Sequence, residues 1–350
     1  MSSSAPSLVS LAPSELAAQR TMLKKVAKKK KKKKKPVATA EDAEEKLLAQ
    51  SGCDDTVRCT SPFKGYEATC VGRESGVRIM TTNVPPNRIY DTRAAAASRP
   101  PIRREDINGV DGAYLVHNVL SDVECARIVK LIDMMGFEHA RITTGEGMVV
   151  DRRIRSNARL ILQTPMMQRL REPSSSAADA DASYDPVNYD YLEAMYARIE
   201  EHMPRECAAR PVVQRTSDGD AIPLWVPVGL NERLRFYRYE GGEVFNRHYD
   251  GCFPRDDGGE MSIYTLIVYL SDAFVGGETT FFVGRGQRTE VAVTPTRGSA
   301  LIFPHGSHPA SPLHEGSVVA EGLKYVLRSD VMCRRSEDVA AAAAAAAAPG

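Results

Sequence analysis

From residue 223 onward, short apolar or aromatic runs alternate with turn residues at intervals typical of a strand followed by a turn. Glycine pairs such as Gly241-Gly242 and Gly276-Gly277 separate the runs, and no long helical pattern lies between them. Many short strands without intervening helices predict a sandwich or a barrel. The expected strands are 232–240, 244–249, 261–270, 279–283, 289–293, 299–304 and 323–332.

Two helices are expected before this β-rich part. Ser121 and Glu124 match a capping box, apolar residues follow at helical spacing, and Gly136 marks the end, which together predict a helix over 121–135. A second helix is expected over 190–203. Both helices are expected to pack on one face of a mainly β core.

Composition changes suggest where the folded domain begins and ends. Residues 1–50 contain a lysine block and are expected to be disordered, because like charges in a block repel and cannot bury a core. Residues 51–112 show no clear periodicity and are predicted only as a poorly defined extension. The folded domain is expected over 113–335, with its core at 232–333, and residues 336–350 form an alanine-rich tail.

Charge is distributed unevenly along the chain. The formal net charge is +1, but Arg20, Lys24, Lys25 and the eight lysines of 28–35 contribute eleven positive charges. The rest of the chain therefore carries −10, so its folded part lacks the basic face that binding to a nucleic-acid duplex requires. The lysine block fits a nuclear address or a tether to nucleic acid or the ribosome, and equally a solvated tail without a specific role.

The cysteines and the apolar runs bear on the compartment. The seven cysteines include no CxxC pair, which argues against a disulfide framework and a thiolate zinc site and favours a reducing compartment. The chain has no apolar run long enough to cross a membrane, and its first residues lack the apolar region of a secretory signal. We therefore expect a cytoplasmic or nuclear protein without a membrane partner, with an organellar transit peptide as the alternative.

A His-x-Asp pair lies within the β-rich part. A strand places residues two apart on the same face, so His248 and Asp250 are expected to point together. One imidazole and one carboxylate are two of the three ligands of a facial triad, which leaves positions open on a non-haem Fe(II) ion. The third ligand must come from another strand, and His305, His308 and His314 are the candidates.

His314 fits this role best, because it lies 64 residues after Asp250 and ten residues before Lys324. The pattern resembles that of the 2-oxoglutarate/Fe(II) dioxygenases of the prolyl 4-hydroxylase type, and the resemblance covers residues 113–334. It implies a double-stranded β-helix (jelly-roll) core. Similar segments occur at 239–242, 263–270, 276–281 and 298–303. The metal ligands that the resemblance implies are His248, Asp250 and His314.

The resemblance also assigns residues to the cosubstrate. Lys324 is expected to bind the far carboxylate of 2-oxoglutarate, because a buried cation suits that group. Tyr269 resembles the family's tyrosine that hydrogen-bonds the same carboxylate. Thr280 is expected to add a hydroxyl, and Tyr239 to contact the cosubstrate or the substrate.

The implied activity is hydroxylation of a C–H bond with O2 and 2-oxoglutarate, releasing succinate and CO2, with ascorbate as a further requirement. The expected substrate is a peptidyl proline, another protein side chain or a small molecule. One rival function is that of a nucleic-acid dealkylating oxygenase, which would place an arginine where this chain has Ala320. The other is a non-catalytic jelly-roll that binds a partner, against which the complete set of ligands argues.

Some residues have a second interpretation. His305 and His308 lie in a loop and are expected to be exposed, to support the metal ligands, or to replace His314 as the distal ligand. Arg328, four residues after Lys324 on the same strand face, is the alternative carboxylate anchor. The basic segment 152–159 either lines the substrate entrance or forms a solvated strand face.

Overall fold

The computed structural model describes residues 56–346, except 75, 92–98, 141, 145–146, 164–190, 210–222 and 256–257. Residues Gly52–Gly350 form one compact unit. The expectations for residues 1–50, including the lysine block, lie outside the described residues.

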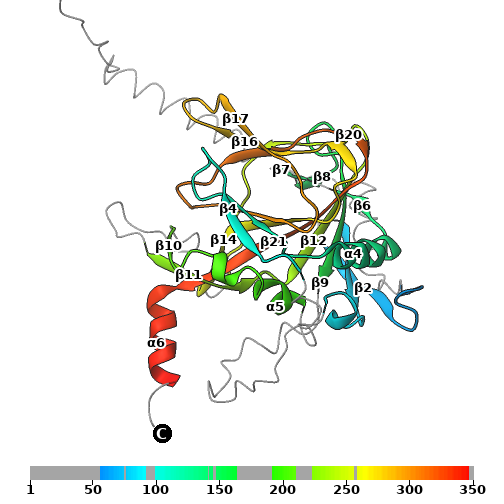
Figure 1. The fold of residues 1–350 in the computed structure, drawn as a ribbon, viewed down its shortest axis with the longest axis horizontal. Helices are drawn as coiled ribbons and strands as arrows, with labels where there is room; N and C mark the ends of the chain where they lie inside the picture. Colours follow the sequence, from blue (N-terminus) through cyan, green and yellow to red (C-terminus); the bar gives the residue numbers. More distant parts are fainter. Residues whose placement is uncertain are drawn as a thin grey trace, which may run out of the picture. The chain divides into compact units, whose positions relative to one another are not determined.

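Most of the described strands belong to one large sheet (Figure 1). β6 (Glu138–His139) pairs with the strand Ala158–Gln163 of this sheet. β10 (Cys207–Ala208) pairs with β11 (Leu224–Leu230), which in turn pairs with the strand Lys324–Arg335. In spatial order, the path through this sheet is β1 (Thr56–Arg58), β2 (Glu67–Glu74), β3 (Val77–Thr82), β9 (Ala158–Gln163), β12 (Arg233–Tyr239), β21 (Lys324–Arg335), β14 (Glu260–Tyr269), β18 (Ala300–Pro304), β5 (Tyr114–His117) and β4 (Arg103–Asp106).

A smaller antiparallel sheet lies over one face of the large sheet, which gives the two layers of a jelly-roll (Figure 1). Its strands are, in spatial order, β13 (Phe245–His248), β19 (Leu313–Gly316), β16 (Thr279–Val283) and β17 (Thr289–Val293). Two further strand pairs are β15 (Phe274–Gly276) with β20 (Val319–Gly322), and β7 (Ile142–Thr144) with β8 (Gly147–Val149).

The helices are few and short, apart from two. They are η1 (Pro86–Arg88), α4 (Asp122–Met135), α5 (Tyr191–Tyr196), η4 (Glu200–His202) and α6 (Ser336–Ala346). α4 begins at the predicted capping box, in which Ser121 accepts from the Glu124 amide and the Glu124 side chain accepts from the Ser121 amide. None of the described helices is both long enough and apolar enough to cross a membrane.

The central strands of the large sheet are buried on both faces. On the outer face, Leu234 and Phe236 of β12 pack with apolar residues of α4 such as Ile128 in one core cluster. On the inner face, Tyr237 and Tyr239 pack in a second cluster with residues of the smaller sheet. The alternation of side chains along β12 thus serves two cores at once, since successive residues of a strand point to opposite faces.

Gly298 makes a close contact between α4 and the sheet. Its φ is +80°, and a Cβ there would lie 2.2 Å from the carbonyl oxygen of Leu120. The Leu120 amide donates to the Gly298 carbonyl at 2.9 Å, so the residue that leads into α4 is fixed directly against the loop before β18. Only glycine fits this position.

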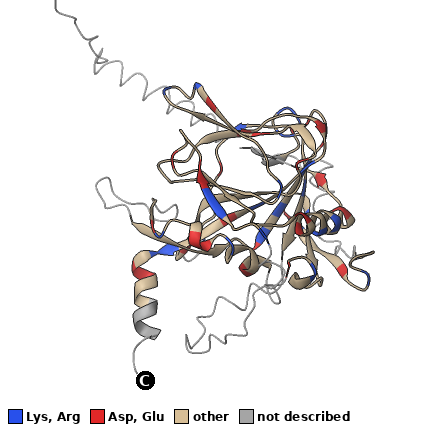
Figure 2. Cartoon of the chain, in the orientation of Figure 1, with Lys and Arg blue, Asp and Glu red and all other residues tan. Residues whose placement is uncertain are grey.

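The fold agrees with the mainly β prediction, and each of the seven strands predicted from residue 223 onward is present. The segment 51–112, for which the sequence indicated no regular structure, contains β2 and β3, which extend the large sheet through the parallel pairing of β3 with β9. The second predicted helix is shorter than expected, since α5 ends at Tyr196 and a separate 3-10 turn follows. Figure 2 shows that basic and acidic residues both occur across the described elements.

Candidate metal centre

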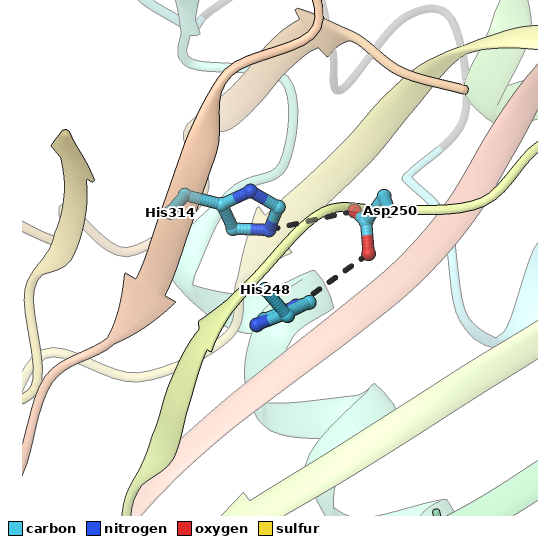
Figure 3. Close-up of side chains that lie close together, drawn as sticks. All are labelled: His248, Asp250 and His314. Carbon is cyan, nitrogen blue, oxygen red and sulfur yellow. Dashed lines mark ion pairs between the residues drawn. The ribbon is translucent and has the colours of Figure 1, made fainter. Parts of the chain in front are cut away.

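His248, Asp250 and His314 lie together between the two sheets (Figure 3). His248 on β13 and His314 on β19 are direct partners across two antiparallel strands. Asp250 follows the end of β13, and its carboxylate oxygens lie 3.6 Å from the Nε2 atoms of both histidines. One ligand atom from each residue lies within 4.8 Å of the others. The structure therefore brings the three predicted ligands into one cluster.

Both imidazoles are held in an orientation suited to a metal. Nδ1 of His248 lies 2.7 Å from the carbonyl oxygen of Asn246, and Nδ1 of His314 lies 3.2 Å from that of Pro312. A carbonyl can only accept, so each Nδ1 donates its proton there, and Nε2 is the ring nitrogen left facing Asp250. Hydrogen bonding of the second ring nitrogen to a backbone carbonyl is the usual support of a metal-binding histidine.

The charge states of the cluster also fit a divalent ion. Burial lowers the pKa of His314 to about 4, so this imidazole is neutral at pH 7. Burial alone would raise the pKa of Asp250, but the adjacent Arg328 guanidinium outweighs it and holds the pKa well below the ordinary value. Neutral imidazoles and an ionised carboxylate are the forms that bind metal. This donor set matches the facial triad of Fe(II) oxygenases.

Asp250 is positioned by two further side chains. Thr265 Oγ1 donates to Oδ2 at 2.7 Å, and Arg328 Nη1 lies 3.0 Å from Oδ1. Because the Thr265 proton goes to Asp250, the hydroxyl accepts from His305 Nδ1 at 2.8 Å, and His305 Nε2 then accepts from Ser262 at 2.9 Å. The carboxylate is thereby fixed by a hydrogen-bonded chain that ends in the interior.

His305 is therefore not an exposed loop residue. The side chain of His305 is buried. The next residue, Gly306, has a φ of +60° and turns the loop back, and the Gly306 amide donates to the Asp250 carbonyl at 3.0 Å. A Cβ at Gly306 would lie 2.7 Å from that of Cys252. Of the interpretations of His305, support of a metal ligand agrees with the structure. His308 is half-buried beside the Tyr264 ring and is not part of the metal cluster.

A small, partly open cavity lies beside the triad, and all three ligands line it. Lys324 and Tyr239, the residues expected to contact the cosubstrate, also line it. Lys324 is fully buried, its Nζ donates to the Gly277 carbonyl at 2.6 Å, and burial lowers its pKa to about 8. Within the described part of the chain, no carboxylate lies at ion-pair distance from this ammonium group. It is thus available to an acidic ligand.

The cavity uses Thr279 rather than Thr280. Thr279 lines the cavity, and its hydroxyl lies 2.9 Å from that of Tyr269. Thr280 Oγ1 instead pairs with Ser317 at 2.9 Å. Adjacent residues of β16 point to opposite faces, so Thr279, and not the expected Thr280, is the residue that faces the cavity. Tyr269 is buried behind Thr279, with its ring 5.8 Å from Lys324 Nζ.

Arg328 also lines the cavity, four residues after Lys324 on β21. Its guanidinium is already paired, with Asp250 at 3.0 Å and with Asp330 at 3.3 Å. Lys324 therefore agrees better than Arg328 with the role of carboxylate anchor. The sequence did not identify Thr265 as a supporting residue, although a hydroxyl at an inward position of the apolar strand β14 is a usable indication.

Phe245 and Tyr237 are two more cavity residues that the sequence did not identify. The Phe245 ring stacks on His248 with a centroid distance of 3.6 Å. Tyr237 lies two residues before Tyr239 on β12, so period-2 alternation from Tyr239 indicates that it faces the same side.

The sequence has relatives among the oxygenases. Residues 234–329 match the family model of the 2OG-Fe(II) oxygenase superfamily. The chain is 30% identical over 141 residues to "Probable prolyl 4-hydroxylase 10" of Arabidopsis thaliana, which covers 35% of this chain and 47% of that protein. It is 38% identical over 96 residues to "Probable prolyl 4-hydroxylase 11" of the same organism, which covers 26% of this chain and 32% of that protein. The chain thus matches less than half the length of either relative.

Among solved structures, the viral collagen prolyl hydroxylase of Paramecium bursaria Chlorella virus-1, in its 2OG complex, aligns at 18% identity with a TM-score of 0.32. The alignment covers 64% of this chain and 97% of that chain. A TM-score this low supports no argument about the chemistry of the site.

Proposed function

We propose that the chain carries a prolyl 4-hydroxylase-like domain of the 2OG-Fe(II) oxygenase superfamily and hydroxylates a C–H bond of a protein side chain, with peptidyl proline as the first candidate. The observation that supports this most is that one cavity combines the triad His248, Asp250 and His314 with Lys324, a buried cation that has no carboxylate at ion-pair distance among the described residues. Fe(II), when bound, supplies the redox chemistry that couples oxidative decarboxylation of 2-oxoglutarate to transfer of one oxygen atom to the substrate. The overall change balances as R–H, O2 and 2-oxoglutarate giving R–OH, succinate and CO2.

The protein residues bind and orient the reactants. His248, Asp250 and His314 would hold the metal, while Arg328 and Thr265 fix the Asp250 carboxylate. Preorganised ligands of this kind keep a site from rearranging during turnover.

Lys324 would bind the distal carboxylate of 2-oxoglutarate, with the Thr279 hydroxyl close by and Tyr239 on the same wall. The apolar side chains of Ile267 and Val326 complete the wall and exclude water, which strengthens the ammonium–carboxylate attraction. By the same family likeness, ascorbate is proposed to maintain activity over many turnovers.

The test measures succinate formation from 2-oxoglutarate by purified protein with and without Fe(II), and with ascorbate added or omitted. We expect turnover to require Fe(II) and to be lost in His248→Ala and Asp250→Ala. Turnover that persists in both variants would refute the metal site. A pool of proline-containing peptides, examined for the gain of one oxygen atom by mass spectrometry, tests the substrate class, and a gain only on residues other than proline would replace proline as the candidate.

A further inference from the structure

Two arginines of the basic segment 152–159 are buried next to the metal cavity. Arg155 and Arg159 are 6% and 8% exposed, whereas Arg153 has a side chain 90% exposed and paired with Asp151. A solvated strand face therefore describes Arg153 but not the other two. A charged side chain is rarely buried to this extent unless something compensates its charge.

Both guanidinium groups lie beside rings that form the cavity wall. The Arg155 Cζ atom is 4.5 Å from the centre of the Tyr237 ring and 4.2 Å from that of Phe245, and Phe245 in turn stacks on His248. Arg159 is the cross-strand partner of Tyr237, so its side chain lies on the same face of the sheet. Phe245 thus separates Arg155 from His248, and both arginines lie behind rings of the cavity wall rather than in the cavity lining itself.

Neither guanidinium is fully satisfied by the protein. Arg155 Nε donates to Asn157 at 2.8 Å, but its Nη2 has no hydrogen-bond partner among the described residues, and the same holds for Nε and Nη2 of Arg159. The nearby acids are already paired. These pairs are Asp330 with Arg235 and Arg328, Asp250 with Arg328, and Glu74 with Arg233.

The local potential is correspondingly positive. Burial alone would raise the pKa of Tyr237, but Arg155, Arg328 and two neighbouring arginines outweigh it and lower the pKa to about 8. Burial also lowers the pKa of Arg159. Both effects indicate that this side of the cavity favours an anion.

We propose that Arg155 and Arg159 bind a carboxylate of the substrate, so that the residue to be oxidised lies in an acidic peptide segment. Five N–H donors in a planar fork match the geometry of a carboxylate, and an incoming Asp or Glu side chain would use the unpaired Nη2 and Nε atoms. The cosubstrate is not this ligand, because Lys324 offers a separate cation within the cavity. The inference rests on the proposed function, since it assigns the substrate class of the same site.

The test uses immobilised protein loaded with Mn(II) and 2-oxoglutarate, which holds a complex without turnover, and a pool of random unphosphorylated peptides. The amino-acid composition of the retained peptides is compared between the wild type, Arg155→Gln, Arg159→Gln and the control Arg153→Gln, which removes the same charge from an exposed position. We expect Asp and Glu to be enriched by the wild type and the control. In the two buried variants, affinity for the retained peptides should fall about tenfold or more.

The outcomes separate the two proposals. Failure of the Mn(II)-loaded wild type to bind 2-oxoglutarate, measured by titration, would count against the proposed function itself. Binding of 2-oxoglutarate without acidic enrichment, or enrichment unchanged in both buried variants, would overturn the inference alone. If either variant fails to fold by circular dichroism, the retained peptides are resynthesised with Asn and Gln for Asp and Glu; undiminished binding of these amides to the wild type would also overturn it.

Discussion

Replacing Lys324 by methionine removes the buried charge and nearly conserves the volume of the side chain. In the protein without cosubstrate, burial lowers the pKa of Lys324 from 10.5 to about 8, which corresponds to about 3 kcal/mol of destabilisation at neutral pH. The lost hydrogen bond to the Gly277 carbonyl offsets about 1 kcal/mol of this. We therefore expect Lys324→Met to raise the free energy of unfolding by about 2 kcal/mol.

The sign of the pH dependence follows from the two protonation states. Between pH 8 and 10.5 the unfolded chain retains the Lys324 proton and the folded protein releases it, so the stability of the wild type rises with pH in this window. The rise is the relief of the buried charge, and it should be absent in Lys324→Met. Thermal unfolding at several pH values, compared with the exposed control Lys130→Met, measures both effects.

Binding of 2-oxoglutarate should change in the opposite direction from stability. Loss of one partner of a buried ion pair costs about 3 kcal/mol, so the dissociation constant should increase on the order of a hundredfold in Lys324→Met. Because only the ammonium form binds a carboxylate, the wild-type dissociation constant should also increase about tenfold from pH 7 to pH 9 for a group with a pKa of about 8.

Calorimetric titration of 2-oxoglutarate into Mn(II)-loaded protein at pH 7 and pH 9 measures both quantities. An unchanged dissociation constant in Lys324→Met, with the pH dependence of the wild type retained, would refute the assignment of Lys324 as anchor. Arg328 would then be the next candidate.

Three further changes test the supports of the site. Thr265→Val should weaken metal binding about 10- to 100-fold, because Asp250 loses a hydrogen bond, and a Mn(II) titration that matches the wild type would contradict this. Gly298→Ala should lower the free energy of unfolding, measured by denaturant titration, by at least about 2 kcal/mol. The control Gly251→Ala should change it little, because a Cβ there meets no atom within 4 Å. Equal effects of the two substitutions would disprove the close contact at Gly298. Adding Mn(II) to metal-free protein should raise the melting temperature, and a chelator should reverse it. The same rise in His248→Ala would place the metal elsewhere.

Local sequence patterns predicted the centre of the molecule well. The strands from 232 onward were predictable because each combines a short apolar run with a glycine-containing turn, and the structure places β12 and β14 within one or two residues of the expected ranges. The triad was predictable because His248 and Asp250 are two residues apart on one strand face and because the resemblance to the dioxygenase family supplies the spacing that selects His314.

Features that depend on long-range pairing were not predictable in this way. β2 and β3 have only partial alternation of buried and exposed residues, and β3 gains its place by pairing with β9, about 80 residues away in the chain. The choice between Thr279 and Thr280 depends on a single-residue register, which the apolar pattern of β16 does not reveal because both sides of this strand are buried. The burial of His305 depends on a loop that folds back on Asp250.

Lys324 and Arg328 illustrate how partners, rather than residue type, separate the roles of two cations on one strand face. Both line the cavity, and the sequence alone allowed either to anchor the cosubstrate. Arg328 lies between Asp250 and Asp330, so its charge is balanced within the protein and its fork orients a metal ligand. Lys324 Nζ donates to a backbone carbonyl and lies beside aromatic rings, and burial lowers its pKa although Glu278 acts in the opposite direction. A dianionic cosubstrate that reaches from the metal to Lys324 supplies a counter-charge, which is why an ammonium group that destabilises the empty protein is expected to stabilise the complex.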